Sequence, residues 1–376
     1  MPHDHAMLTR RDMLRGAAGG MLAAGLANPL ITAAQDAPKS DRKIGWALVG
    51  LGRLTMGELL PAFAQTKHCK VTALVSGSPD KAKKLAEKYG VDQKSIYNYD
   101  NYDEIRNNPD VDVIYIVLPN SMHAEYTIRG AKAGKHIFCE KPMAISSDEC
   151  RQMIDACKQA NKKLAIAYRL RYEPYNQTAI QMVHEQAVGP AKVIVADAGF
   201  NLPDPNAWRL NKELAGGGAL LDIGIYALNA TRYLTGEEPI EVNALIQENP
   251  TDPRFKEVEE SCVWQTRFPS GILANCSTSY AYNWQNRYRV IGTNGFFDVD
   301  PFLAYRGLRM SVKRGSAEPE EVQLPQVNHF AAEMDHFSQC VIEDKEPLTP
   351  GEEGLMDHIV MEAIYQSARE GKTIKL

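Results

Sequence analysis

Asp222 and Tyr226 are the residues of this chain whose types and spacing most directly suggest chemistry. Side chains four positions apart share one face of a helix, so a carboxylate and a phenol would lie side by side here. A carboxylate accepts hydrogen bonds from hydroxyl groups, and a phenol exchanges a proton more readily when a nearby cation lowers its pKa from about 10. An amphipathic helix without any catalytic role explains the same spacing.

Gly216, Gly217 and Gly218 come just before this pair. A turn needs one glycine, whereas three in a row allow the backbone to approach another group closely. We therefore expect this backbone to pass close to a bound ligand.

Gly50 and Gly52 form a second candidate site, between the apolar stretch Lys43–Val49 and a helical stretch over Met56–Gln65. A strand, a glycine turn and a helix in this order bind the pyrophosphate of a dinucleotide, because the glycines let the phosphate reach the amides at the helix N-terminus. Thr55 stands where the fingerprint has a third small residue. This departure predicts a slightly loosened or shifted packing of helix on strand.

The elements after the glycine turn continue to alternate. Lys70–Val75 and Val113–Leu118 are predicted strands, and Pro79–Tyr89 is a predicted helix. The strands are apolar enough to be buried on both faces, as in a parallel sheet covered by helices. Residues 43–168 are therefore predicted to form a Rossmann domain.

The residues after the second strand predict which dinucleotide binds. An Asp or Glu at this point holds the adenosine ribose of NAD and repels an added phosphate. This chain has no acid there, and Ser76, Ser78 and Lys81 are available to a phosphate. Arg53 could stack on the adenine or reach the same phosphate. We therefore predict NADP rather than NAD.

Beyond Arg171 the pattern changes to longer strands joined by tight turns. Val263–Phe268 and Ile272–Ser279 are predicted to form one hairpin, and Arg287–Ile291 and Phe296–Val299 another. Polar residues on one face predict a large, mainly antiparallel sheet with an open face that must be covered. We therefore predict an α+β domain over residues 169–376.

Length and composition agree with two domains. The chain has 376 residues, of which 44% are hydrophobic and 24% charged, as in soluble globular proteins. A net charge of -5 and the lack of a basic stripe argue against nucleic acid as a partner.

The cysteines form no CxxC pair and have no metal-ligand spacing, so no metal site is predicted. Each is expected to be a small buried residue: Cys69, Cys139, Cys150, Cys157, Cys262, Cys276 and Cys340.

Residues 1–34 are predicted to be an export signal. Arg10 and Arg11 precede a weakly apolar, Gly/Ala-rich stretch over 16–31, and small residues at 32–34 suit cleavage near Gln35 or shortly after. The apolar run is shorter than the ~20 residues of a spanning helix, so the mature chain is expected to have no membrane segment. We predict that the twin-arginine export machinery carries the folded protein to the periplasm, with residues 35–42 as a linker.

Further motifs carry a resemblance to a known family. They are Leu118–His123, Cys139–Pro142 with its Glu-Lys-Pro triplet, Tyr168–Arg169, Trp208–Leu210 and Leu214–Tyr226. Through them the chain resembles the glucose–fructose oxidoreductase, inositol dehydrogenase and rhizopine-catabolism (Gfo/Idh/MocA) superfamily over essentially everything after the signal. Within it, the chain is most similar to the periplasmic glucose–fructose oxidoreductases and their aldose–aldose oxidoreductase relatives.

The resemblance implies an activity and an assembly. The expected enzyme holds NADP tightly, oxidises an aldose at its anomeric carbon to a lactone, and reduces a second sugar with the same cofactor. The open sheet face is expected to form the interface of a homo-oligomer, either a dimer or a tetramer. Two closing helices, over Phe330–Ile342 and Gly354–Ala368, are expected to pack near the first domain.

The resemblance also assigns roles to residues. Tyr226 would be the acid/base, Lys141 would tune it and contact the substrate and the nicotinamide ribose, and Asp222 would bind sugar hydroxyls. Many relatives have His in place of this Tyr. The residues expected at the cofactor are Gly50, Gly52, Arg53, Leu54, Ser76, Gly77, Lys81, Leu118, Pro119, Asn120, His123, Glu140, Lys141, Arg169, Trp208 and Arg209.

Some of these assignments have plain structural alternatives. His123 is equally well explained as a structural histidine, Trp208 as a core residue, and Arg169 and Arg209 as partners of surface acids. Two other functions also stay open, a dehydrogenase with exchangeable NADP and a non-catalytic NADP-binding sensor. The choice of sugar is expected to rest on loops such as Phe200–Asn206.

Overall fold

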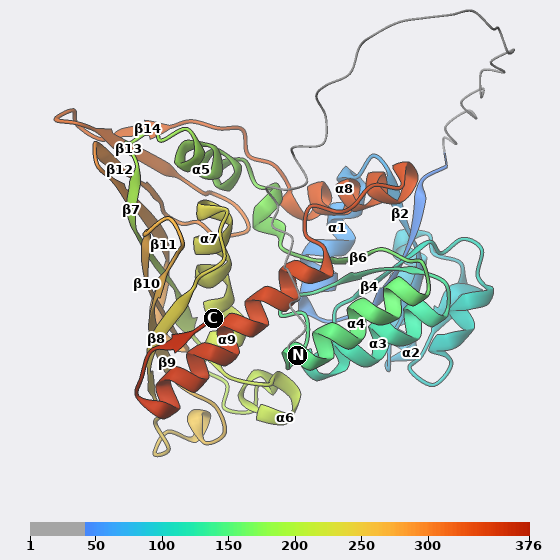
Figure 1. Ribbon diagram of the computed structural model, residues 1–376. Coiled ribbons are helices and arrows are strands. Elements are labelled where there is room, and N and C mark those ends of the chain that lie inside the picture. Colours follow the sequence, from blue (N-terminus) through green and yellow to red (C-terminus); the bar gives the residue numbers. More distant parts are fainter. Residues whose placement is uncertain (1–41) are drawn as a thin grey trace, which may run out of the picture. The chain divides into compact units, whose positions relative to one another are not determined.

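The computed structural model describes residues 42–376, and the predicted export signal and most of the linker lie outside the described residues. The described part contains two sheets (Figure 1). Among its helices, none is long and apolar enough to cross a membrane.

The first sheet is six-stranded and parallel, in the order β3-β2-β1-β4-β5-β6. Its strands are β1 (Ile44–Val49), β2 (Cys69–Val75), β3 (Ile96–Tyr97), β4 (Val113–Ile116), β5 (His136–Cys139) and β6 (Leu164–Ile166). This arrangement confirms the predicted Rossmann fold. Strand β4 ends at Ile116 rather than Leu118. The Val117 N–H still donates to Val49 O, but the chain then turns away at Pro119.

Helices cover both faces of this sheet. One face carries α3 (His123–Lys132) and α4 (Ser147–Gln159), and the other carries α2 (Pro79–Tyr89), the first helical segment (residues 55–65) and α8 (His329–Glu343). Trp46 of β1 lies edge-on to rings from both the sheet and α8, including Phe138 and Phe337. Because α8 comes from the end of the chain, this packing ties the C-terminal part to the first sheet (Figure 1).

The second sheet is nine-stranded, in the order β14-β13-β12-β11-β7-β10-β9-β8-β15, and only the β7–β10 pair is parallel. Its strands are β7 (Ala191–Asn201), β8 (Glu241–Gln247), β9 (Ser261–Arg267), β10 (Leu273–Ser279), β11 (Ala281–Gly292), β12 (Gly295–Val299), β13 (Met310–Arg314), β14 (Glu320–Val322) and β15 (Ile374–Lys375). The β9–β10 and β11–β12 hairpins confirm the two predicted from sequence.

One face of this sheet is covered by α5 (Pro174–His184), α7 (Ile225–Thr235) and α9 (Gly351–Glu370), while no described helix covers the other (Figure 1). Exposed apolar side chains lie on the strands of this second sheet: Leu245, Val263, Leu273 and Ile291. Leu245 is 68% exposed and pairs with Val263 across β8 and β9. The predicted open face is therefore present.

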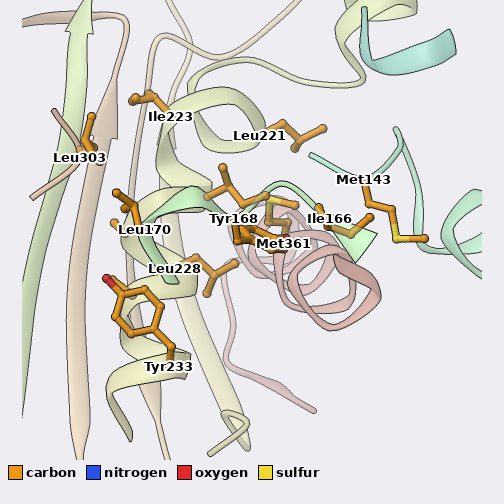
Figure 2. Close-up of a cluster of buried hydrophobic side chains, with 14 of the residues drawn as sticks. Met143, Ile166, Tyr168, Leu170, Leu221, Ile223, Leu228, Tyr233, Leu303 and Met361 are labelled. Carbon is orange, nitrogen blue, oxygen red and sulfur yellow. The ribbon is translucent and has the colours of Figure 1, made fainter. Parts of the chain in front are cut away.

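A shared hydrophobic cluster joins the two sheets (Figure 2). It draws side chains from the segment after β5, from β6 and the turn after it, from the helix that ends in α7, from α9 and from the loop before β13: Met143, Ile166, Tyr168, Leu170, Leu221, Ile223, Leu228, Tyr233, Leu303 and Met361. Beside it, the buried Asp357 carboxylate binds Arg232 at 2.5 Å and accepts the Tyr168 hydroxyl at 2.6 Å. The helix that carries Asp222 and Tyr226 is therefore held firmly against the Rossmann sheet.

All seven cysteines lie within the described residues, and each is buried and unpaired, as the sequence predicted. Burial raises the pKa of every thiol, to about 12 for Cys69 and Cys157.

Candidate active site

The glycine turn after β1 leaves room for a phosphate. Gly50 has φ +95°, and a Cβ there would lie 2.3 Å from Val117 O, so only glycine fits. A Cβ at Gly52 would meet nothing within 4 Å. The first glycine thus makes the turn, and the second leaves the helix N-terminus open to a pyrophosphate.

Thr55 is held against the glycine turn. Its side chain is fully buried, and its hydroxyl donates to Gly50 O at 2.6 Å. Thr55 is the first residue of a π-helical turn, Thr55–Leu59, which continues as α1 (Leu60–Ala62). The shifted packing of helix on strand stays a prediction. Arg53 is exposed beside this turn and Leu54 is half-buried.

The segment after β2 folds back toward the glycine turn. The Ser76 hydroxyl accepts from the Ser78 N–H at 3.1 Å, and Lys81 Nζ donates to Leu51 O at 3.3 Å. A Cβ at Gly77 would lie 3.2 Å from the Tyr99 ring. The hydroxyl and the cation predicted to read the adenosine end thus lie at the same edge as the glycine turn.

Lys141, Asp222 and Tyr226 come together from two distant parts of the chain. Lys141 follows β5, Asp222 lies in the π-helical turn Leu220–Gly224, and Tyr226 is in the first turn of α7. Lys141 Nζ lies 4.5 Å from the centroid of the Tyr226 ring, 3.7 Å from Asp222 Oδ1 and 2.6 Å from Asp222 O. One ammonium group therefore contacts both predicted partners.

The two oxygens of the Asp222 carboxylate have different surroundings. Oδ2 accepts from Arg209 Nε and from the Tyr280 hydroxyl, both at 3.0 Å, whereas Oδ1 has only the longer ion pair with Lys141. Burial favours a higher pKa for Asp222, but Arg209, Lys141 and Tyr280 together hold that pKa below its usual range. The carboxylate is therefore ionised at neutral pH and has one oxygen available to a ligand.

Arg169 lies on the other side of Tyr226. Its guanidinium carbon is 5.2 Å from the centroid of the Tyr226 ring and 4.7 Å from that of Tyr305, and Nη2 donates to Leu303 O at 2.5 Å. Burial, together with the charge of Tyr226, raises the pKa of Tyr305 to about 12. Arg169 is thus a buried cation between two tyrosines rather than the partner of a surface acid.

Trp208 and Arg209 lie together at the end of the loop that follows β7. The guanidinium carbon of Arg209 is 4.6 Å from the centroid of the Trp208 ring, and its ion pair is with Asp222. Trp208 is partly exposed and supports Arg209 rather than filling the core.

Four other predicted cofactor residues have structural partners. Both ring nitrogens of His123 lie 2.9 Å from backbone carbonyls, those of Leu118 and Pro142, and burial lowers the His123 pKa. Asn120 donates to Ala215 O at 2.8 Å. Glu140, whose pKa is raised by burial, accepts the Tyr115 hydroxyl at 2.7 Å. Leu118 is buried, and its side chain lies 3.0 Å from where a Cβ on Gly50 would be.

The three consecutive glycines are explained by packing within the protein. A Cβ at Gly216 would lie 2.7 Å from Ile145, one at Gly217 2.3 Å from the Tyr365 hydroxyl, and one at Gly218 2.5 Å from Glu259 O. The backbone therefore approaches other parts of the protein closely, and its approach to a ligand stays a prediction.

Glu259 explains why the backbone comes so close. Its carboxylate accepts from the N–H groups of Gly218 and Leu220 at 3.0 and 2.9 Å, and from the Tyr365 hydroxyl at 2.9 Å. These bonds anchor the start of the helix that carries Asp222.

Comparison with known proteins places this geometry in a family. Residues 44–168 match the model of an oxidoreductase family with an NAD-binding Rossmann fold, and residues 176–298 match the Gfo/Idh/MocA C-terminal domain. The chain is also 30% identical to D-xylose 1-dehydrogenase [NADP(+)] of Haloarcula marismortui over 353 residues, which cover 91% of this chain and 96% of that protein. The chain belongs to the Gfo/Idh/MocA oxidoreductase family.

Other family members are similar along most of their length. The crystal structure of aldose–aldose oxidoreductase from Caulobacter crescentus complexed with glycerol has a TM-score of 0.87 and 48% identity, covering 89% of this chain and all (100%) of that one. The 1,5-anhydro-D-fructose reductase of Ensifer adhaerens is 24% identical, over 88% of this chain and 98% of that protein.

The family's nicotinamide cofactor fits the residues present. The open space at Gly52 suits a pyrophosphate, and the parallel strands β2 and β5, which Ser76 and Lys141 follow, end at the same edge of the sheet. Tyr280 and Tyr305 were missed by sequence reasoning because neither belongs to a recognisable motif. They reach the site from the end of β10 and from the loop before β13, and only the folded chain brings them there.

Proposed function

We propose that this protein is an NADP-dependent sugar oxidoreductase that oxidises an aldose at its anomeric carbon and reduces a second sugar with the same tightly bound cofactor. The observation that carries the proposal is the arrangement of Tyr226, Lys141 and Asp222. The 48% identity to an aldose–aldose oxidoreductase supports the pair of sugar substrates. Before the reaction, the folded protein would be exported to the periplasm by the twin-arginine route.

Each residue of the trio has a distinct task. Asp222 Oδ1 and the Lys141 ammonium bind hydroxyl groups of the sugar, and the Tyr226 side chain, as the general base, takes the proton of the anomeric hydroxyl. Held at the glycine turn and the ends of β2 and β5, NADP would supply the hydride acceptor for the first sugar and the hydride donor for the second. The lactone is released, and Tyr226 returns its proton to the carbonyl oxygen of the second sugar as that carbonyl is reduced.

The adenosine end supports NADP over NAD. Ser76 and Lys81 would hold the 2′-phosphate, and the amides near Gly52 the pyrophosphate. The D-xylose 1-dehydrogenase relative is itself named for NADP.

Ser76→Asp is expected to shift cofactor preference toward NAD. A carboxylate at this position would face the 2′-phosphate, and like charges in contact cost several kcal/mol, so the NADP-to-NAD ratio of kcat/KM should fall about 100-fold or more. The measurement is kcat/KM for NADP and for NAD, each added over a range of concentrations to enzyme stripped of its bound cofactor. Ser76→Ala, which adds no charge, is the control and should keep the preference for NADP. An unchanged ratio in Ser76→Asp would show that the phosphate is held elsewhere.

The open face of the second sheet supports a homo-oligomer. Leu245 and Val263 form an exposed apolar pair on neighbouring strands, and water contact at such a pair is unfavourable. Association through this face would cover it. Sedimentation equilibrium should give a dimer or tetramer.

The decisive experiment measures the absorbance and fluorescence of the purified protein before and after adding glucose, with no nicotinamide supplied. We expect a reduced-cofactor signal that appears with an aldose and disappears when fructose or a second aldose is added. If no cofactor copurifies and activity needs added NADP, the protein is a dehydrogenase with exchangeable cofactor. If no reduced-cofactor signal appears even with added NADP and a panel of sugars, the protein is instead a sensor or acts on another substrate.

A further inference from the structure

Tyr280 is held in one orientation by its backbone and its ring. Its N–H donates to Glu260 O at 3.0 Å, and its carbonyl accepts the Leu202 N–H at 2.9 Å. The ring is fully buried and packs edge-on against Phe200, with the centroids 5.5 Å apart. The phenol therefore has little freedom, and its hydroxyl points at Asp222 Oδ2.

Two donors from different elements fix the Asp222 carboxylate. Arg209 Nε approaches Oδ2 from the segment Trp208–Leu210, and the Tyr280 hydroxyl approaches it from the end of β10, each at 3.0 Å. A carboxylate held by one donor can rotate and exchange its oxygens, whereas two donors on one oxygen fix the plane. Oδ1 therefore stays on the side of Lys141, 3.7 Å from its Nζ.

The pair formed by Asp222 Oδ1 and Lys141 Nζ determines which chemical group of a substrate can bind to both atoms. A carboxylate oxygen only accepts a hydrogen bond and an ammonium only donates one, while a hydroxyl group does both. A hydroxyl placed between them satisfies both partners. A carbonyl satisfies only the ammonium, and an anionic group would be repelled by Asp222.

We propose that Tyr280 is a positioning residue, whose hydroxyl holds Asp222 so that Oδ1 and the Lys141 ammonium together bind one hydroxyl of the sugar. This role rests on the proposed function, because it assigns the hydroxyl to the aldose oxidised there. The pair of Oδ1 and the Lys141 ammonium would favour substrates that carry a neutral hydroxyl group at the bound position, as opposed to sugar acids or sugar phosphates.

The pH dependence follows from the groups around Asp222. Arg209, Lys141 and Tyr280 face it from three other segments, and Tyr226 lies on its own helix. The hydrogen bond from Tyr280 is one of the interactions that lower the pKa of the carboxyl, so its removal raises that pKa. Activity that needs the ionised carboxylate is then lost at a higher pH than in the parent enzyme.

The test follows the reduction of enzyme-bound NADP⁺ by an aldose across the acid pH range, in single-turnover experiments with NADP⁺ loaded beforehand. These experiments work whether or not the cofactor exchanges, with kcat/KM as the second-order rate constant and KM as the aldose concentration at half the maximal rate. In Tyr280→Phe we expect kcat/KM to fall about tenfold, mainly through KM, and the acid limb of its pH profile to move up by about one unit. Tyr288→Phe is the matched control: its hydroxyl is buried on β11 and binds Asn176 Oδ1 at 3.1 Å, so this variant should lose stability but keep the parent's acid limb.

The outcomes separate the two proposals, because the assay needs neither a second sugar nor a retained cofactor. An unchanged acid limb in Tyr280→Phe, with an active parent enzyme, overturns the positioning role and leaves the proposed function intact. If the parent enzyme oxidises no aldose, the proposed function and this role fall together.

Discussion

Tyr226→Phe is expected to lower kcat for aldose oxidation by about 10²–10⁴-fold, the range that general acid/base groups contribute. The substitution removes only the hydroxyl, and that hydroxyl has no hydrogen-bond partner among residues 42–376. The ring keeps its contacts with Lys141 and Arg169. Folding and bound NADP should therefore be unchanged, as judged by thermal unfolding and by the absorbance of the copurified cofactor.

Tyr233→Phe controls for the loss of a phenol from the same helix. Tyr233 lies on α7, is buried, and donates to Asn176 Oδ1 at 2.8 Å, away from Lys141. This variant should unfold at a lower temperature but turn over at the parent rate. Normal turnover in Tyr226→Phe would remove Tyr226 from the mechanism.

Asp222→Asn is expected to lower kcat/KM for the aldose by about 100-fold or more. The amide oxygen of Asn can take the place of Oδ2 and accept from Arg209 and Tyr280, but the NH₂ group would then face the Lys141 ammonium. Two donors would face each other, and the largely buried Lys141 ammonium would lose its counter-ion, a change that costs about 2–5 kcal/mol. Initial rates over a range of sugar concentrations should show a higher KM as well as a lower kcat.

Asp148→Asn provides the matched control. Asp148 also pairs with an arginine, Arg151 at 2.7 Å, but on the exposed surface of α4. Exposed pairs of this kind contribute about 0–1 kcal/mol, so the control should leave both activity and folding nearly unchanged. Equal effects of the two substitutions would mean that Asp222 acts only through overall charge.

Local patterns in the sequence were sufficient for the fold and for the centre of the site. The apolar strands, the turn at Gly50 and the hairpin turns depend on neighbouring residues, and such patterns can be read from a single chain. The trio of Lys141, Asp222 and Tyr226 was named through the family motifs, and the structure brings its members together.

Contacts between distant segments could not be read in this way. Tyr280 is an ordinary strand-end tyrosine until the fold places it 3.0 Å from Asp222 Oδ2. The glycines at 216–218 show the same limit, because close approach to Glu259 or Tyr365 and close approach to a ligand require the same residue type. The structural role of His123 likewise could not be predicted, because its ring contacts carbonyls from two loops that meet only in the folded chain.

The reactivity of the buried thiols can be used to measure local unfolding of this protein. The thiolate is the nucleophile that attacks alkylating reagents and peroxides, so a protonated, inaccessible cysteine reacts only when the structure around it opens. Cys139 and Cys150 lie in the Rossmann part, Cys262 and Cys276 in the second sheet, and Cys340 on α8. The rate at which each native cysteine is alkylated therefore measures the stability of its own region, and no additional cysteine has to be introduced by mutation.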